Sequence, residues 1–461
     1  MNNMKLKHYT LAFSLLLIGC ESDFGDMNVD PNNPSDALPD LLLTSALKDV
    51  STVAGAVTGA LYVQYFAETQ YTEDSRYGTD QYDFTGWYSS PLNDLQAIIN
   101  SATATNNYKG AARIAKAYFL HNLTDRWGML PYSQALLGAD NFQPAYDTQE
   151  AIYKGLITDL TEAVTVFDAN SALNGDILFG GDVARWAQWG NTIRMVMALR
   201  LSDIDPSYAQ TEYTAAISAG VIDADVMYAH LAEDANASPW YSRFITRTDY
   251  AISNTMDDAM TAKSDLRLLK YADPAPDAEG AGATGLDLIV GMTYGISNGE
   301  AGDIPNQAVS FPGMAIRSQN SALPVYTVAQ VHLCKAEAAV LGWGGDAATE
   351  YNSGVTASFS QWGVDGAGAY LAANPYVDIS SIAYEKWVAA FPSGYEAWAE
   401  WRRLDSPALT PAIDAQNTSG EIPVRHAYPQ TESELNATNY NAAVALQGAD
   451  ILDTKLWWDA N

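Results

Sequence analysis

Two neighbouring stretches with a helical pattern, separated by a very short turn, restrict the fold more than any other feature of this sequence. Residues 328–341 contain alanines small enough for close helix packing, Gly342 ends the stretch, and a second helical pattern covers residues 347–362. Such a pair is typical of a tetratricopeptide-type hairpin, whose apolar faces are buried only when neighbouring hairpins stack on it. Residues 382–390 and 395–403 repeat the arrangement across a Pro-Ser-Gly break. We therefore expect a mainly α fold with a tetratricopeptide-like helical-repeat frame.

Residues 230–325 interrupt this helical pattern. They are richer in Gly, Pro, Asp and Ser, and their helical period is less clear. Residues 280–285 match GxGxxG, but a dinucleotide-binding turn follows a strand, and here a loop-like run containing two prolines precedes it. We interpret residues 230–325 as a loop-rich excursion from the frame. The length allows one large repeat-built domain or two ordinary ones, and the 48% of hydrophobic residues is ample for a core. Because helical hairpins bury their apolar faces only by stacking on neighbours, we expect residues 41–461 to form a single domain.

The N-terminus resembles a bacterial lipoprotein signal. Lys5 and Lys7 precede an apolar run over residues 9–18, which is too short to be a stable membrane anchor, and Gly19 stands directly before Cys20. We expect a signal peptide over residues 1–19, lipidation of Cys20, and a polar tether over residues 20–40. An ordinary signal peptide with a chance cysteine is the alternative.

Charge and cysteine content exclude several classes of partner and stabilisation. The net charge of −31 becomes −33 when a signal peptide carrying Lys5 and Lys7 is removed. Such an acidic surface repels phosphate backbones, so we expect no nucleic-acid partner. Cys334 is the only cysteine besides Cys20, so the mature chain has no intramolecular disulfide available.

Six segments, in this order along the chain, resemble the SusD/RagB family of outer-membrane nutrient-binding lipoproteins, in its SusD-like branch. They are DRWGMLPY at 125–132, WGNTIR at 189–194, KAEAA at 335–339, EAW at 396–398 followed by WRR at 401–403, PVRHAYP at 423–429, and KLWWD at 455–459. We interpret Asp125, Arg126, Arg402 and Arg403 in these segments as structural residues that lock neighbouring repeats.

The resemblance implies a function as well as a fold. Members of this family bind oligosaccharides, or in some cases peptides, and deliver them to SusC-like TonB-dependent transporters in the outer membrane. It therefore implies a surface-exposed binder of oligosaccharide or polysaccharide, anchored through Cys20 and facing the exterior. Glu21 and Asp23 resemble an export signal to the outer face. A peptide-binding member of the same transport system is the first alternative.

The sequence contains little that indicates an enzyme. HExxH, GxSxG and Walker motifs are absent from the sequence, and the histidines after the signal, His121, His230, His332 and His426, are scattered. We interpret Cys334 as a small core residue. The 55 acidic residues make chance carboxylate pairs inevitable, so a surface glycosidase stays a weaker alternative. We therefore expect that the protein is not an enzyme, needs no cofactor and has no set of metal-ligating residues.

Two aromatic clusters are the candidate ligand site. The first, over residues 71–88, contains Tyr71, Tyr77, Tyr82, Phe84, Trp87 and Tyr88, and the second contains Trp240, Tyr241, Phe244, Tyr250 and Tyr294. Aromatic faces stack on sugar rings, and neighbouring carboxylates and amides can bond to the hydroxyls. The ligand-binding residues that we predict are Tyr77, Trp87, Tyr88, Trp240, Tyr241, Tyr250 and Tyr294. We expect Trp87 with Tyr77 and Tyr88 to face Trp240 or Tyr250 across the bound ligand.

A locally basic run lies beside the second cluster in this acidic chain. It consists of Arg243, Arg247, Lys263, Arg267 and Lys270. Two interpretations stay open at this stage. Asp265 and Arg267 can pair within the fold, or the run can meet a carboxylated ligand.

Overall fold

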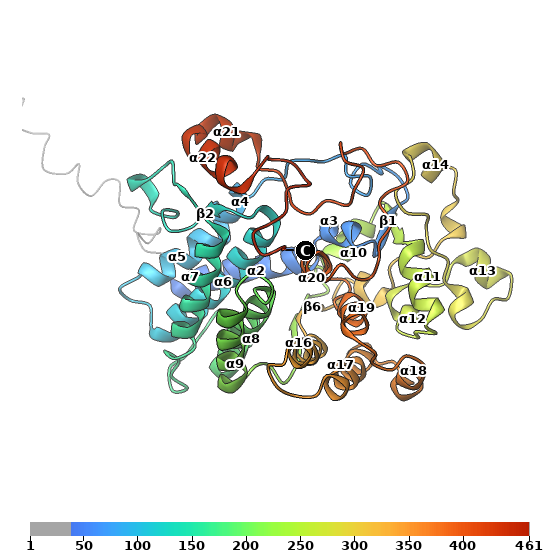
Figure 1. The fold of residues 1–461 in the computed structure, drawn as a ribbon, viewed down its shortest axis with the longest axis horizontal. Helices are drawn as coiled ribbons and strands as arrows, with labels where there is room; N and C mark the ends of the chain where they lie inside the picture. Colours follow the sequence, from blue (N-terminus) through green and yellow to red (C-terminus); the bar gives the residue numbers. More distant parts are fainter. Residues whose placement is uncertain (1–37, 461) are drawn as a thin grey trace, which may run out of the picture.

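The computed structural model describes residues 38–460, so Cys20 and the predicted signal peptide lie outside the described residues, as does almost all of the tether. Helices make up 54% of the structure and strands 5%, which confirms the mainly α fold class. The frame helices are α2 (Pro39–Ala54), α3 (Val57–Tyr62), α5 (Asn93–Asn100), α6 (Asn106–Trp127), α7 (Gln149–Ala163), α8 (Val183–Arg200), α9 (Pro206–Ala219), α16 (Val328–Val340), α17 (Ala347–Gln361), α18 (Ala367–Ala373), α19 (Ile379–Ala389) and α20 (Gly394–Leu404). At the C-terminus α21 (Gln430–Leu435) and α22 (Ala437–Gln447) lie together at the upper edge of Figure 1.

The predicted hairpin is formed by α16 and α17, within one residue of the expected ends. Both helices start at a side-chain cap: the Thr327 hydroxyl accepts from the Gln330 amide at 3.1 Å, and Asp346 accepts from the Thr349 amide at 2.8 Å. Gly342 turns the chain with a φ of +77°, a conformation that glycine adopts without strain. A Cβ on Gly354 would lie 2.8 Å from a carbon of Leu333, so the glycine permits the close approach of the two helices.

The excursion begins and ends at one small sheet. Strand β4 (Val226–Tyr228) pairs antiparallel with β6 (Leu323–Tyr326), and these strands flank residues 230–325. Between them lie the short helices α10 (Pro239–Phe244), α11 (Asn254–Ala262), α12 (Leu268–Tyr271), α13 (Pro276–Gly280), α14 (Asn298–Gly302) and α15 (Met314–Arg317). In Figure 1, α11, α12 and α13 gather at one side of the molecule, away from α5 and α7.

A second pair of strands joins the excursion to the frame. Strand β1 (Phe66–Glu68) follows α3, and β5 (Tyr250–Ile252) belongs to the excursion. They pair antiparallel, with Phe66 opposite Ile252 and Glu68 opposite Tyr250. Side chains from the excursion, including Ile252 and Met256, belong to the same buried cluster as those of α2 and α6. The assignment of residues 41–461 to one domain stays a prediction.

A buried charge network joins five frame helices. It consists of Asp125, Arg200, Glu337, Lys386, Glu396, Glu400 and Arg403. Arg200 bonds Asp125, Glu396 at 2.8 Å and Glu400 at 2.9 Å. Glu337 bonds both Lys386 and Arg403. Because these charges are paired away from water, the network fixes α6, α8, α16, α19 and α20 relative to one another.

The family-typical arginines are structural, as predicted. Arg402 donates to the carbonyls of Asp125 and Val424 and stacks on the Trp398 ring at 3.8 Å. Arg126 lies against three rings, with its guanidinium carbon 4.4 Å from the centre of the Tyr395 ring. Together with Asp125 and Arg403 in the charge network, these contacts confirm that the motif residues hold the repeats together.

One described segment, Pro39–Tyr62, is long and apolar enough to cross a membrane by length and composition alone. It corresponds to α2 and α3, and half of its most apolar window is buried inside the fold. The buried residues of α2, including Leu43, Leu47 and Val50, belong to the main core. This segment therefore serves as a core element of the helical frame.

Candidate functional site

Three of the predicted ligand-binding residues are buried and inaccessible to a ligand. Tyr77 and Trp240 have no exposed surface, and Tyr294 has 5%. The Tyr77 hydroxyl accepts from the Ala412 amide at 3.0 Å, and the Trp240 ring lies 4.6 Å from that of Phe66. The prediction that these three rings face a ligand is wrong. Long-range packing, which joins the excursion to the frame, has drawn them into the core.

Trp87 and Tyr88 lie on another part of the surface. Trp87 belongs to α4 (Thr85–Trp87) and its ring packs 5.7 Å from Phe119. The Tyr88 hydroxyl donates to the Pro131 carbonyl at 2.6 Å, and Tyr88 lines a surface hollow of about 540 Å³. Among the described residues no ring contact joins Trp87 or Tyr88 to Trp240 or Tyr250. The expected platform across these residues is therefore not assembled.

One residue of the first cluster meets the basic run beside the second cluster, just beyond the β1–β5 pair. We call this place the junction surface and define it by Gln70, Tyr71, Arg247, Asp249 and Asn298. Tyr71, from the first cluster, is 58% exposed. Arg247, beside the second cluster, places its guanidinium carbon 4.6 Å from the centre of the Tyr71 ring.

Several contacts hold the Tyr71 ring in place. Its backbone has a φ of +55°, and its amide donates to the Asn298 side chain at 2.6 Å. Arg247 bonds Asp249 at 2.6 Å, and Asp249 also accepts from the Gln70 amide group at 2.5 Å. An exposed aromatic ring in this setting is already ordered, so it loses little conformational entropy when a ligand covers it.

Glu68 stabilises the loop that carries Tyr71. One of its carboxyl oxygens accepts from both the amide and the hydroxyl of Ser75, each at 2.9 Å, which closes the loop that carries Tyr71. Glu68 is 5% exposed, and burial raises the pKa of its carboxyl group to about 8. The group is therefore largely protonated at neutral pH. Tyr250, its partner across the strands, is only partly buried, as is Tyr241 on α10.

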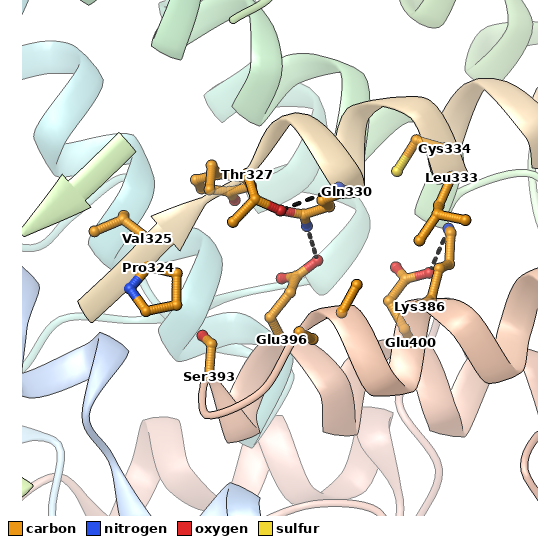
Figure 2. A pocket seen from close by; sticks show the side chains of 13 residues that line it. Pro324, Val325, Thr327, Gln330, Leu333, Cys334, Lys386, Ser393, Glu396 and Glu400 are labelled. Carbon is orange, nitrogen blue, oxygen red and sulfur yellow. Dashed lines mark hydrogen bonds and ion pairs between the residues drawn. The ribbon is translucent and has the colours of Figure 1, made fainter. Parts of the chain in front are cut away.

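A cavity in the helical frame does not match a ligand site. Figure 2 shows it between α16 and α20, where the Gln330 amide group donates to Glu396 at 2.9 Å and Lys386 bonds Glu400. Its volume of about 30 Å³ is enough for roughly one or two water molecules. Cys334 lines it, and burial raises the pKa of this thiol to about 12. Cys334 is thus the buried, inert core residue that the sequence predicts.

Other titratable groups also act within the fold. Arg267 is fully buried and bonds Asp265 at 2.6 Å and Glu385 at 2.8 Å, which confirms its structural pairing. His332 bridges α16 to Glu350 on α17 at 2.6 Å. Over residues 38–460 no group of three or more His, Cys, Asp or Glu side chains is arranged to hold a metal ion.

Over residues 38–460 the structure combines a helical-repeat frame with an exposed aromatic ring, Tyr71, that Arg247 contacts. The chain belongs to the SusD-like family, described as starch-binding and associating with the outer membrane, whose model matches residues 31–429. Members of this family are binding proteins rather than enzymes, so the expectations of family membership and of a non-enzymatic role are confirmed. Association with the outer membrane follows from the same family.

Solved structures share the fold over nearly the whole chain. A chitin-binding protein is 25% identical, with a TM-score of 0.80 over 92% of this chain and all of the other. A SusD homologue from Bacteroides fragilis is 22% identical, with a TM-score of 0.82 over 91% of this chain and 99% of that one. A chitin-binding SusD homologue from Flavobacterium johnsoniae is 23% identical, with a TM-score of 0.79 over 92% and 99%. No curated protein matches the chain.

Proposed function

We propose that this protein captures an oligosaccharide or polysaccharide nutrient at the junction surface. The observation that carries the proposal is the exposed Tyr71 ring, held in place by Arg247 and Asn298 beside the polar groups of Gln70 and Asp249. The ring offers an apolar face to a sugar, while the amide and carboxylate groups around it can bond to hydroxyls. Tyr241 and Tyr250 are the predicted residues that remain candidates for flanking contacts.

The comparisons support a glycan ahead of a peptide. The family description names starch, and two of the structural relatives are described as chitin-binding. Neither description identifies the sugar bound by this chain, because the similarity to those structures is at or below 25% identity.

Isothermal titration of residues 38–460 with a panel of malto-, chito-, xylo- and pectic oligosaccharides tests the proposal. Tyr71→Ala should weaken binding about tenfold, since a stacked ring contributes on the order of 1–2 kcal/mol. Phe142→Ala is the matched control, because Phe142 is an exposed ring (81%) in the hollow that Tyr88 lines. If Phe142→Ala weakens binding and Tyr71→Ala does not, the hollow is the site and the junction surface is not.

The delivery system is proposed on the family resemblance. We expect the protein to be lipidated at Cys20, to face the exterior, and to pass its ligand to a SusC-like TonB-dependent transporter. Cys20→Ala should release the protein from the membrane fraction of the native strain. Copurification after mild detergent extraction tests the transporter. Elution of the protein alone under those conditions would contradict the partnership.

A further inference from the structure

Arg243 is partly buried and differs from Arg200 and Arg402, whose buried guanidinium groups bond carboxylates or backbone carbonyls. Its Nη1 atom is buried without a hydrogen-bond partner, and within residues 38–460 no hydrogen bond or ion pair to its side chain is found. Its guanidinium group lies over the Trp240 ring, with the guanidinium carbon 5.0 Å from the centre of that ring. Burial lowers the pKa of Arg243 from its ordinary value, because the nearby Tyr250 phenol offsets the desolvation only in part.

The two carboxyl groups around the β1–β5 pair are engaged with other residues. Glu68 accepts from Ser75 and is largely protonated at neutral pH. Asp249 bonds Arg247 and Gln70. Arg126 and Arg402 also lack a carboxylate partner among the described residues, but both donate to backbone carbonyls. In that part of the chain Arg243 has neither kind of partner, and desolvating an unpaired charge is costly.

The position of Arg243 points toward the proposed ligand site. It lies on α10 four residues before Arg247, whose guanidinium covers one side of the exposed Tyr71 ring. The Trp240 ring, on which Arg243 lies, is 6.2 Å from the ring of Tyr250, and Tyr250 directly follows Asp249 of the junction surface. Arg243 keeps part of its surface exposed.

We propose that Arg243 is the anion-recognition residue of the junction surface, and that the ligand bound there is a carboxylated glycan containing uronate sugars. The proposal rests on the glycan-binding function proposed above. A uronate carboxylate would accept two hydrogen bonds from the Nε and Nη2 groups of the planar guanidinium, since Nη1 is buried, and its ring would lie against Tyr71. Arg247 adds a second positive charge at the edge of the site, which offsets the repulsion from the acidic surface of the protein.

Matched ligands make the test direct. Isothermal titration compares uronate oligosaccharides, namely oligogalacturonate, oligoglucuronate and alginate oligomers, with the methyl ester of each, so that only the charge of the carboxyl group changes. We expect at least one acidic form to bind at least tenfold more tightly than its ester, as a charge-assisted hydrogen bond to a buried guanidinium would give. Arg243→Gln should remove this difference and leave the affinity for the ester unchanged.

Two further variants separate recognition from structure. Arg243→Lys should keep only part of the preference, because an ammonium group lacks the two-pronged geometry of a guanidinium. Arg113→Gln is the control, since Arg113 forms a partly exposed ion pair with Glu162 on the helical frame and should change nothing. The melting temperature of Arg243→Gln should equal or exceed that of the wild type, because an unpaired charge has been removed.

The outcomes are distinguishable. If neutral glycans bind and no acid binds more tightly than its ester, the anion site is overturned while the glycan-binding function stands. If oligoglutamate binds more tightly than every uronate, the ligand is an acidic peptide and the glycan assignment is wrong. If Arg243→Gln lowers the melting temperature and weakens every ligand equally, Arg243 is a structural residue. Failure of every glycan in the panel to bind would overturn the proposed function itself.

Discussion

Arg200 and Arg403 lie buried in the helical frame and each bonds at least two carboxylates, whereas Arg243, beside the junction surface, bonds none. Both environments desolvate a guanidinium, but only the frame compensates for the cost within the chain. The charge network of the frame pairs its guanidinium groups with carboxylates of the same network, whereas Arg243 has no carboxylate partner within residues 38–460. The comparison therefore separates the part of the molecule that holds its shape from the part that is prepared to bind.

Breaking one buried pair should produce the largest effect. Glu337→Gln removes one of the two carboxylates that Lys386 and Arg403 share, the other being Glu400, and we expect the free energy of unfolding to fall by about 3–5 kcal/mol. Urea denaturation measures it. Glu162→Gln is the control, because the Arg113–Glu162 pair is solvent-accessible and should contribute less than about 1 kcal/mol. Equal losses in both variants would show that the network does not stabilise the frame as described.

Aromatic residues should show the same division. Trp240→Ala empties a fully buried site against Phe66 and should lower the free energy of unfolding by about 3–5 kcal/mol. Tyr71→Ala, at an exposed ring, should change it by less than about 0.5 kcal/mol. Thermal melting of both variants tests this. A large loss for Tyr71→Ala would mean that the ring belongs to the core of the junction and not to a binding surface.

Glu68 predicts a pH dependence of smaller size. Burial raises its folded pKa to about 8 from an ordinary value of 4.5, so between these values the folded state holds a proton that the unfolded state has released. The contribution of Glu68 to stability should therefore decline as the pH rises from 5 to 8, by about 2–4 kcal/mol, since one pKa unit corresponds to about 1.4 kcal/mol.

Glu68→Gln isolates this contribution. The amide oxygen of glutamine can still accept from Ser75, so the loop should keep its hydrogen bonds while the titration disappears. Urea denaturation at pH 5 and pH 8 should show a smaller decline for the variant than for the wild type. Identical pH profiles for the two proteins would contradict a raised pKa at this position.

The smallest expected effect concerns the hydroxyl of Tyr71. Tyr71→Phe keeps the ring that we propose to stack on the ligand, so the affinity should stay within about twofold of the wild-type value, while Tyr71→Ala loses about tenfold. Titration with the best ligand of the panel compares the two. A loss as large for phenylalanine as for alanine would show that hydrogen bonding, and not stacking, is the role of Tyr71.

Local patterns in the sequence were sufficient for much of the fold. The caps, spacing and small residues of 328–362 specify a helical hairpin because helix formation depends on neighbours three and four residues away. The same holds for Arg267, whose first partner, Asp265, is two residues away. For the six family segments, their order along the chain was enough to recognise the family that the comparison confirms.

Only the tertiary structure decided which aromatic rings face water. Tyr71 belongs to the first aromatic cluster of the sequence but was not among the predicted ligand-binding residues. Tyr77 and Trp240 were predicted to bind the ligand, and both are buried. Exposure at these positions depends on the pairing of Glu68 with Tyr250, 182 residues apart, and on the packing of Trp240 against Phe66. The type of an aromatic residue determines how much surface its ring can bury. Contacts between segments distant in the sequence determine which rings are buried, and the local hydrophobic pattern does not predict those contacts.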